Sequence, residues 1–300
     1  MRLGVDFGGT KIEGALLDSK GEILVRQRVP NPGDYASAVK AVAELAARIE
    51  QESGARAVTV GVAMPGSLSP ATGMVRNANS IWLNGKPFYE DLKAVLNRPL
   101  RVENDANCFA LSEAVDGAAA GARVVFGVIL GTGCGGGVVV DRHVIEGVNG
   151  VAGEWGHTPL PWRRADEDAG RHWCGRANCL EQWISGSGFK WWSGMSGDEA
   201  DKAARAGDVK ARVALDELAD RIARGLAVVI DILDPDVIVF GGGLSNIDQL
   251  YPSVRGKLLA HVFSDVVKTK LVKNMHGDSS GVRGAAWLFE PDGEASEYMA

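Results

Sequence analysis

The stretch GVDFGGTKIEGALLD (residues 4–18) has the same build as GVILGTGCGGGVVVD (residues 127–141). In each, an apolar segment runs into a glycine-rich turn and resumes as a second apolar segment, which predicts two strands joined by a tight hairpin. Each hairpin opens a region of alternating strands and amphipathic helices, such as the helices expected over 35–52 and 209–233, and a long loop region is expected over 147–179. Glycines alone explain one tight hairpin, but two matching ones indicate paired α/β domains whose turns expose backbone N–H groups.

The composition is that of an ordinary globular protein, with 46% hydrophobic and 23% charged residues among 300. The 32 basic and 38 acidic residues leave a net charge of −6, which disfavours nucleic acid and anionic membranes as partners. No apolar run approaches the roughly 20 residues that span a bilayer, so we expect a cytoplasmic protein that acts on small molecules. Four cysteines in this length indicate thiols or metal ligands rather than a disulfide framework.

The second glycine turn satisfies the G-x-G-x-x-G pattern of dinucleotide-binding folds, but a β-branched segment follows it where that fold requires a helix. We therefore interpret both turns as hairpin tips that receive phosphate oxygens. Asp6, directly before the first turn, either caps the strand end or holds a hydrated Mg²⁺ beside the phosphates. A third glycine cluster, at 241–243, precedes a helix and fits the flat face of an adenine ring. The residues assigned to nucleotide binding are Asp6, Gly8, Gly9, Thr10, Lys11, Gly131, Thr132, Gly133, Gly135, Gly242 and Gly243.

The other notable cluster is of the zinc-ligand type. Cys174 and Cys179 stand near His172 and His157, so that four such side chains fall within 23 residues. For the two cysteines taken alone, a pair of buried thiols is the alternative interpretation.

Seven segments together resemble the ROK family of bacterial sugar kinases and repressors, over nearly the whole chain. They are DFGGTK (6–11), ENDAN (103–107), GTGCGGG (131–137), GEWGH (153–157), CGRANCLE (174–181), DPDVIVFGGGLSN (234–246) and HGDSSGVRGAAWL (276–288). Within the family, three further segments look most like bacterial fructokinases of the manno(fructo)kinase type. These are NANSIWLNGKPF (77–88), SEAVDGAAAGA (112–122) and GEWGHTPLPW (153–162).

The resemblance implies an α/β protein with the actin-like ATPase (ribonuclease H-like) fold, in which nucleotide and sugar bind in a cleft between two domains. We expect a small N-terminal domain over 1–118, completed by a C-terminal helix over 286–300. A large domain over 119–285 would carry a zinc-binding loop region. Each domain would contribute one phosphate-holding turn, which accounts for the duplicated hairpin. The resemblance also suggests a homodimer.

Phosphoryl transfer to a hydroxyl needs a carboxylate at the attacking O–H and neutralised charge on the phosphates. The bare sequence favours a helix N-cap at Asp105, but this residue matches the family's catalytic base in its NDAN motif. The resemblance further implies a structural zinc ion held by His157, His172, Cys174 and Cys179, with His172 where the family has a cysteine. The residues that it assigns to sugar binding are Gly66, Asn79, Asn104, Asp105, Glu154, His157 and Glu181.

The resulting hypothesis is ATP- and Mg²⁺-dependent phosphorylation of a hexose at its 6-hydroxyl, with D-fructose as the leading substrate and fructose 6-phosphate as the product. N-acetylglucosamine kinases of the same family share the segments DFGGTK, NDANCFALSEA and GGGLSN, so N-acetylglucosamine is the alternative. A ROK-type transcriptional repressor is disfavoured, because Asp6 already belongs to the phosphate motif and leaves no room for a helix-turn-helix. A filament-forming ATPase would require neither the zinc-type cluster nor the sugar carboxylates.

Overall fold

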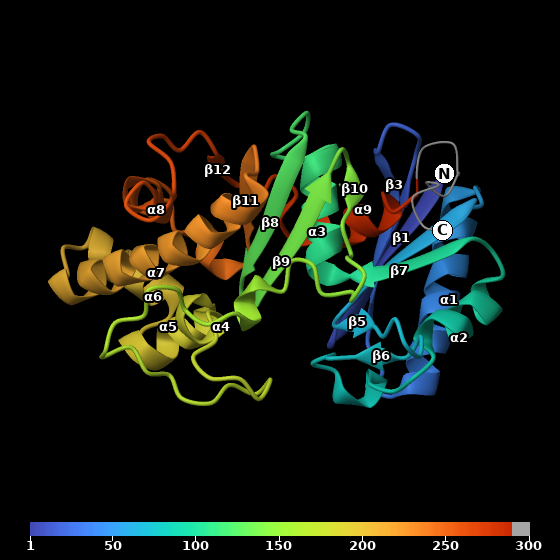
Figure 1. Ribbon diagram of the computed structural model, residues 1–300. Helices are drawn as coiled ribbons and strands as arrows, with labels where there is room; N and C mark the ends of the chain where they lie inside the picture. Colours follow the sequence, from blue (N-terminus) through green and yellow to red (C-terminus); the bar gives the residue numbers. More distant parts are fainter. Residues whose placement is uncertain (290–300) are drawn as a thin grey trace. The chain divides into compact units, whose positions relative to one another are not determined.

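The structure, a computed structural model, describes residues 1–289, with the side chain of Asp278 left out. The chain divides into two units (Figure 1). The first comprises Met1–Ala120, Arg142–Ala152 and the segment from Met275 onward, and the second comprises Gly121–Asp141 and Gly153–Asn274. Among the described residues, no helix combines the length and the apolar composition needed to cross a membrane.

The first unit is built on a five-stranded sheet of order β3-β2-β1-β4-β7. Strands β1, β4 and β7 are parallel, and β2 and β3 continue the sheet antiparallel to β1. The strands are β1 (Arg2–Phe7), β2 (Lys11–Leu17), β3 (Ile23–Pro30), β4 (Thr59–Met64) and β7 (Leu100–Asn104). A small hairpin, β5 (Ser67–Leu68) and β6 (Val75–Arg76), lies in the connection after β4.

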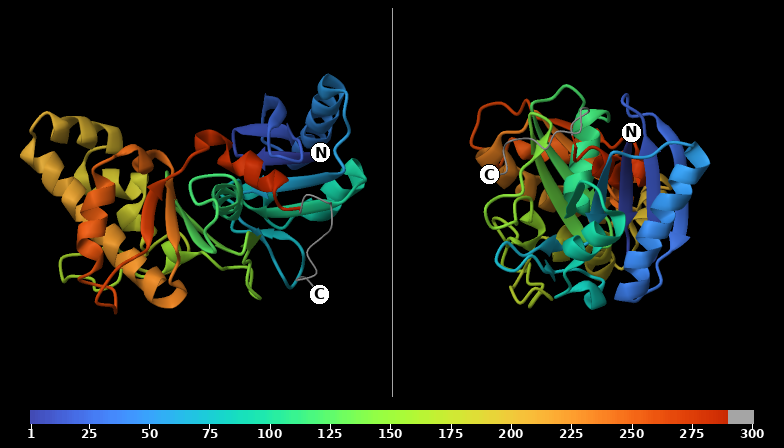
Figure 2. Two further views of the ribbon diagram at one scale, coloured as in Figure 1. Left: turned by 90° about the horizontal axis from the view of Figure 1, so that it is seen from above. Right: turned by 90° about the vertical axis from the view of Figure 1, so that its right-hand side faces the viewer.

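Helices cover both faces of this sheet (Figure 2). One core joins Leu3 and Val5 to the apolar stripe of α1, and a second joins Ala15 and Leu17 to α9. The helices of this unit are α1 (Tyr35–Ser53), α2 (Phe88–Leu96), α3 (Asp105–Val115) and α9 (Ser280–Ala286). The helix expected over 286–300 falls mostly on residues 290–300, which lie outside the described part of the chain, and α9 ends at Ala286.

Two glycines let α9 rest directly on the sheet. Gly4 of β1 and Gly61 of β4 are paired in register. A Cβ at Gly4 would lie 1.9 Å from the carbonyl oxygen of Val282, and one at Gly61 would lie 1.7 Å from that of Ala285. No side chain fits in those spaces, so the close packing of α9 on the parallel strands requires glycine at both positions.

The second unit contains strands in the order β9-β8-β11-β12. The short strand β10 (His143–Val144) belongs to the first unit. Strands β8, β11 and β12 are parallel, while β9 is antiparallel to β8. The strands are β8 (Val124–Leu130), β9 (Cys134–Val140), β11 (Val237–Gly241) and β12 (Lys270–Lys273). The helices are α4 (Glu181–Ile184), α5 (Gly186–Ser193), α6 (Gly197–Arg205), α7 (Val209–Leu233) and α8 (Leu250–Leu258).

The predicted elements are present, and their ends lie within a few residues of the expected ones. The predicted 209–233 helix is α7, which ends at Asp234 in a left-handed conformation directly before Pro235. Helices α2 and α5 were not predicted, because nine and eight residues are too few to establish a helical period. Between residues 147 and 179 the regular structure is one 3-10 turn, η2 (Trp155–His157), so the long loop region is confirmed.

Candidate active site and metal centre

A row of charged side chains crosses the sheet of the first unit. Strand pairing places Arg28 opposite Glu13, Glu13 opposite Asp6, Asp6 opposite Ala63, and Ala63 opposite Glu103. Residues paired in register point to the same face of a sheet. The row lies near the carboxyl ends of the parallel strands, which is where ligands bind in open α/β sheets. Motifs that are far apart in the sequence therefore meet along one line.

Asp6 lies in an environment that disfavours its negative charge. Burial, followed by the negative charges of Asp105 and Glu13, raises the pKa of Asp6 to about 7. A Cβ at Gly281 would come within 2.8 Å of the Asp6 carboxylate, so α9 also approaches this group closely. A divalent cation bound at Asp6 would offset the negative charge that burial and these neighbouring carboxylates disfavour.

The first glycine turn is anchored to its surroundings by its backbone. The N–H of Gly8 donates to the carbonyl of Lys11 at 3.0 Å, and the side chain of Asn31 donates to the carbonyl of Gly8 at 2.8 Å. Gly9, Thr10 and Lys11 are exposed at the tip. The tip begins two residues after Asp6, so that it starts next to this carboxylate in the chain.

Asn104, and not Asp105, caps α3. The side-chain oxygen of Asn104 accepts from the N–H of Ala106 at 2.9 Å, and its amide nitrogen donates to the carbonyl of Gly66 at 2.9 Å. The N-cap alternative for Asp105 is therefore wrong. Asp105 is the first residue of the helix, exposed, with one oxygen 2.8 Å from the N–H of Ala106. The structure thus brings together three predicted sugar residues, Gly66, Asn104 and Asp105.

The segment 77–88 is held by Asn84, whose side chain accepts from the N–H of Ala78 and donates to the carbonyl of the same residue, both at 2.9 Å. Asn79 lies exposed inside the turn that these bonds close. Asn84 therefore shapes the segment, whereas Asn79 presents its side chain to solvent.

Glu103 is a buried carboxyl that the sequence did not single out. Its Oε1 accepts from the N–H of Asn104 at 2.6 Å and from the side chain of Asn107 at 3.0 Å, and it also forms a hydrogen bond with Glu146. Burial, and then the negative charge of Glu146, raise the pKa of Glu103 to about 8. Glu103 therefore keeps its proton at neutral pH, and its hydrogen bond with Glu146 ties the segment 142–152 to the end of β7.

The Glu103→Gln variant is expected to be more stable than the wild type at high pH only. The wild-type protein should lose stability as pH rises from the ordinary glutamate pKa of 4.5 through about 8, because a buried group must ionise. Glutamine stays neutral and can still accept from Asn104 and donate to Glu146. Urea unfolding should show that the variant gains on the order of 2 kcal/mol in the free energy of unfolding at pH 9 and nothing at pH 5. Glu146→Gln, which removes only the neighbouring charge, should give a smaller gain, and parallel pH profiles for wild type and Glu103→Gln would contradict the assignment.

In the second unit, the tip at 131–133 joins β8 to β9, a strand, as predicted from the β-branched residues. The N–H of Gly131 donates to the carbonyl of Gly133 at 3.0 Å, and the N–H of Cys134 donates to Oε2 of Glu181 at 2.8 Å. Gly242 has a φ of 79°, and a Cβ there would lie 2.5 Å from the backbone of Leu130. The third glycine cluster thus packs beside the start of the second tip, so the predicted nucleotide residues of this unit are neighbours.

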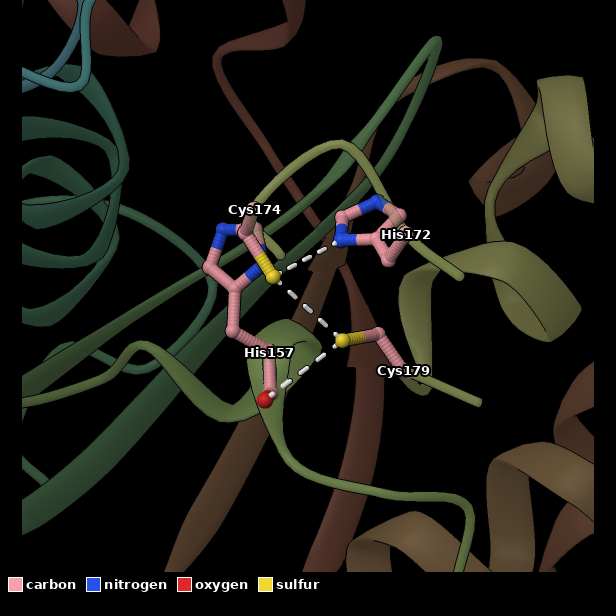
Figure 3. A group of neighbouring side chains, drawn as sticks. All are labelled: His157, His172, Cys174 and Cys179. Atoms are coloured by element: carbon pink, nitrogen blue, oxygen red, sulfur yellow. Dashed lines mark hydrogen bonds between the residues drawn. The ribbon is translucent and has the colours of Figure 1, made fainter. Parts of the chain in front are cut away.

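The four predicted metal ligands form one cluster (Figure 3). One ligand atom from each of His157, His172, Cys174 and Cys179 lies within 4.8 Å of all the others. The two sulfurs are 3.6 Å apart, which is too long for a disulfide of about 2.05 Å. It is close to the spacing of about 3.8 Å that a tetrahedral zinc ion with 2.3 Å Zn–S bonds imposes.

The imidazole rings are oriented as ligands. Nδ1 of His157 is buried and has no hydrogen-bond partner among the described residues, while Nε2 lies 3.7 Å from the carboxylate of Glu154. Nδ1 of His172 lies 3.1 Å from Sγ of Cys174, and its Nε2 contacts Oε1 of Glu181 at 2.9 Å. A metal ion would satisfy the orphaned nitrogen, and the opposite ring nitrogens already have carboxylate neighbours.

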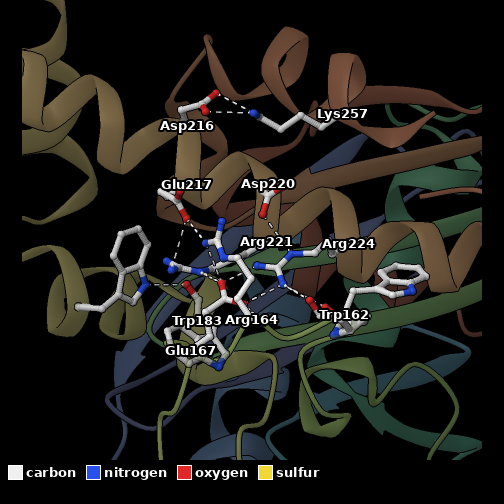
Figure 4. Close-up of polar contacts among 12 residues, drawn as sticks. Trp162, Arg164, Glu167, Trp183, Asp216, Glu217, Asp220, Arg221, Arg224 and Lys257 are labelled. Atoms are coloured by element: carbon white, nitrogen blue, oxygen red, sulfur yellow. Dashed lines mark hydrogen bonds and ion pairs between the residues drawn. The ribbon is translucent and has the colours of Figure 1, made fainter. Parts of the chain in front are cut away.

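A buried ion-pair network anchors the loop that carries these ligands (Figure 4). Glu167, which is 2% exposed, accepts from Arg221 at 3.0 Å and from Arg224 at 2.9 and 2.6 Å, both on α7. Arg224 also donates to the carbonyls of Pro161 and Trp162, each at 3.1 Å. Burial alone would raise the pKa of Glu167, but hydrogen bonds from Arg224, the Arg164 backbone and Arg221 outweigh it and lower this pKa to about 2.

Glu113 is a second buried acid that the sequence did not single out. It is fully buried at the end of α3 and accepts from the N–H groups of Ala118 and Met275, both at 2.9 Å, and from the hydroxyl of Ser280 at 2.9 Å. These partners lie beside the points where the chain leaves the first unit and returns to it. In the sequence, Glu113 and Glu167 look like ordinary solvated acids, and no local pattern marks either.

Comparison with known proteins agrees with this geometry. The family model described as "ROK family" matches residues 2–291. An N-acetyl-D-glucosamine kinase of Photobacterium profundum is 39% identical over 300 residues, covering 96% of this chain and 99% of the relative. A similar protein from Vibrio cholerae is 40% identical with the same coverage. These relatives are named as N-acetyl-D-glucosamine kinases, not as the fructokinases that the sequence motifs suggested.

Solved structures give the same result for the fold. A ROK hexokinase from Thermus thermophilus has a TM-score of 0.84 and 30% identity, with 95% of this chain and 96% of that one covered. A ROK glucokinase from Streptomyces griseus, solved with glucose and AMPPNP, has a TM-score of 0.77 and 27% identity over 96% and 98% of the two chains. The predicted actin-like α/β fold is confirmed, and the chain belongs to the ROK family.

Proposed function

We propose that this protein is a sugar kinase that transfers the γ-phosphoryl group of ATP to the 6-hydroxyl of a hexose. The observation that carries the proposal is the meeting, at the carboxyl ends of β1, β4 and β7, of the buried Asp6 with the exposed Asp105. One carboxylate is placed to hold a cation beside a phosphate-binding turn, and the other is accessible to a substrate hydroxyl. Family membership supports the same reaction class.

Asp105 is proposed as the general base. Asn104 takes the capping role, so the Asp105 carboxylate can act on the attacking hydroxyl, accept its proton and orient its oxygen toward the phosphorus. Asn104, Gly66 and Asn79 are proposed to position the sugar from the first unit. Glu154, His157 and Glu181 are proposed to do so from the second, where Nε2 of His157 and the Glu154 carboxylate are neighbours.

The nucleotide is proposed to bind through the two glycine hairpins. The N–H groups of Gly8, Gly131 and Cys134 are bonded within the protein. The rest of each tip, at 9–11 and 132–133, with the hydroxyls of Thr10 and Thr132 and the charge of Lys11, is proposed to receive the phosphate oxygens. Gly242 and Gly243 are proposed to lie against the adenine ring of the nucleotide. Asp6 would hold Mg²⁺, which when bound neutralises the phosphates and compensates the charges that raise the pKa of this carboxyl.

The His157–Cys179 cluster is proposed to bind a structural zinc ion. The donor set of two thiols and two imidazoles, and the unpartnered Nδ1 of His157, fit a closed tetrahedral site. With Nδ1 on the metal, the His157 ring is fixed so that Nε2 faces Glu154 and a sugar hydroxyl. His157, His172, Cys174 and Cys179 would thus hold a zinc ion that orders the loop, and its effect on the sugar would be limited to the orientation of the His157 ring.

Removal of the metal with a chelator is expected to loosen residues 153–181 and to weaken sugar binding roughly tenfold. The reason is that His157 and the loop lose the ion that joins them. Hydrogen exchange of loop peptides and calorimetric titration with sugar would measure both effects. Cys174→Ala should reproduce them, whereas Cys108→Ala, at a cysteine outside the cluster, should keep full metal content. Unchanged sugar affinity in the metal-free protein would refute this role.

The identity of the sugar is the finer part of the proposal. N-acetyl-D-glucosamine is the first candidate, supported by relatives near 40% identity. D-fructose is the second, supported by the segment NANSIWLNGKPF, in which Asn84 closes a turn that presents Asn79. The two sugars differ in ring size and in the acetamido group, and hydrogen bonds to such groups decide specificity.

A coupled assay of ADP release across fructose, mannose, glucose, N-acetylglucosamine and N-acetylmannosamine tests the function and ranks the sugars. One sugar should exceed the others in kcat/KM by at least about tenfold. Phosphorylation at the 6-hydroxyl should be checked by NMR of the product. No ATP-dependent phosphorylation of any of the five would overturn the proposed function. Light scattering of the purified protein tests the proposed homodimer separately.

A further inference from the structure

The carboxylate of Glu181 connects two parts of the second unit that the sequence analysis assigned to different sites. Its Oε1 accepts from Nε2 of His172 and from the indole N–H of Trp173, both at 2.9 Å, and its Oε2 accepts from the backbone N–H of Cys134 at 2.8 Å. Glu181 is 16% exposed, so these bonds are partly shielded from water. Both oxygens are engaged within the protein, which a residue serving only a sugar ligand would not need.

The two ends of this connection belong to different sites. His172 reaches the metal cluster through its other ring nitrogen, which lies 3.1 Å from Sγ of Cys174. Cys134 ends the glycine tip at 131–133, which is proposed to hold phosphate. The tip fits closely around the carboxylate, because a Cβ at Gly133 would lie 2.8 Å from Oε2 of Glu181.

The chemistry of the three groups explains how the metal cluster can affect the position of the glycine tip. A carboxylate only accepts hydrogen bonds, so Nε2 of His172 must carry its proton, and Nδ1 then presents its lone pair to the cluster. A metal ion bound to Nδ1 would fix the ring and, through Nε2, the position of Glu181. Hydrogen bonds to an ionised acceptor are roughly twice as strong as neutral ones, and here one of them holds the tip amide.

We propose that Glu181 is a positioning residue that couples the metal cluster to the phosphate-binding tip, so that metal binding orders the tip and increases affinity for nucleotide phosphates. The part that concerns nucleotide rests on the proposed function. The coupling itself rests only on contacts among His172, Glu181 and Cys134.

Two variants cut the connection at different points. Glu181→Gln replaces one oxygen by an NH₂ group, which faces an N–H donor whichever way the amide is turned. His172→Cys keeps a metal-binding side chain but removes the imidazole N–H that reaches Glu181. Trp173→Phe is the matched control, because it deletes a donor to the same oxygen and leaves the path through His172 intact.

The primary readout is hydrogen exchange of a peptide covering 130–137, measured with the full chain saturated with zinc and after chelation. In the wild type, chelation should accelerate exchange of the Cys134 amide and lower MgADP affinity by roughly fivefold or more. Glu181→Gln and His172→Cys should retain zinc yet exchange fast with and without it, and their MgADP affinity should no longer depend on zinc. Trp173→Phe should keep the zinc dependence.

The coupling would be overturned if chelation left the exchange rate of the 130–137 peptide unchanged in the wild type. It would also be overturned if Glu181→Gln and His172→Cys both exchanged at the wild-type rate, or if chelation lowered MgADP affinity equally in the wild type and Glu181→Gln. Loss of zinc dependence in Trp173→Phe would assign the effect to the indole and overturn the route through His172. If the proposed function fails, the pattern is different: neither the wild type nor any variant binds MgADP, while hydrogen exchange of the wild-type tip still depends on zinc.

Discussion

Replacement of Asp105 by asparagine should lower kcat by roughly two to four orders of magnitude and leave both dissociation constants nearly unchanged. Asparagine has the same shape and can keep the contact with the N–H of Ala106, so the start of α3 is preserved. It cannot accept the proton of the attacking hydroxyl. The coupled ADP assay measures kcat, and calorimetric titration with sugar and with MgADP measures binding.

Asp91→Asn is the matched control for this variant. It removes one negative charge from the same unit, at a half-buried carboxylate that accepts from the hydroxyl of Tyr35 at 2.6 Å. Its turnover should stay within about threefold of the wild type, as for a group outside the chemistry. If Asp105→Asn retained a tenth or more of the wild-type turnover, another residue would have to act as the base.

Glu167→Gln is expected to give the largest loss of stability, roughly 3–5 kcal/mol in the free energy of unfolding. The substitution removes the buried negative charge that compensates Arg221 and Arg224, and these two side chains cannot reach water without moving the loop. Urea unfolding at pH 7 measures the loss. Because the pKa of Glu167 is lowered to about 2, the difference between variant and wild type should shrink as pH falls from 4.5 toward 2.

Glu217→Gln provides the comparison for this prediction. Glu217 pairs with Arg164 and Arg221 but is 35% exposed, so its loss should cost less than about 1 kcal/mol. Equal losses for the two variants would mean that burial does not control the strength of this network. A loop that loosens in Glu167→Gln should also release the metal more easily, which a chelator competition would detect.

The hairpins were predictable because their signal is local. Apolar residues flank a glycine turn within fifteen residues, and the β-branched run after Gly137 excludes the helix of a dinucleotide fold. The metal cluster was also predictable, since three of its four ligands lie within eight residues and share one loop. Local spacing constrains such groups before any tertiary contact is made.

The roles of single acids were not predictable in this way. Asn104 and Asp105 are both favoured N-caps, and only the contact with Gly66 and the start of α3 shows which residue caps the helix. Glu103, Glu113 and Glu167 look like surface acids in the sequence, yet each is buried against a partner at least 43 residues away: Glu146, Met275 and Arg224, respectively. A carboxylate's role depends on which donors surround it, and those donors are brought by the fold.

By itself, the sequence determined the α/β class, the two glycine hairpins, the long loop and the set of metal-type ligands, because each depends on residue types at short spacing. Tertiary structure alone decided that Asp6, Glu13 and Arg28 stand in one row, and that Glu181 touches both His172 and the second hairpin. These facts depend on strand register and on loop closure over tens of residues. Both are set by the packing of the whole unit and leave no periodic trace in the chain.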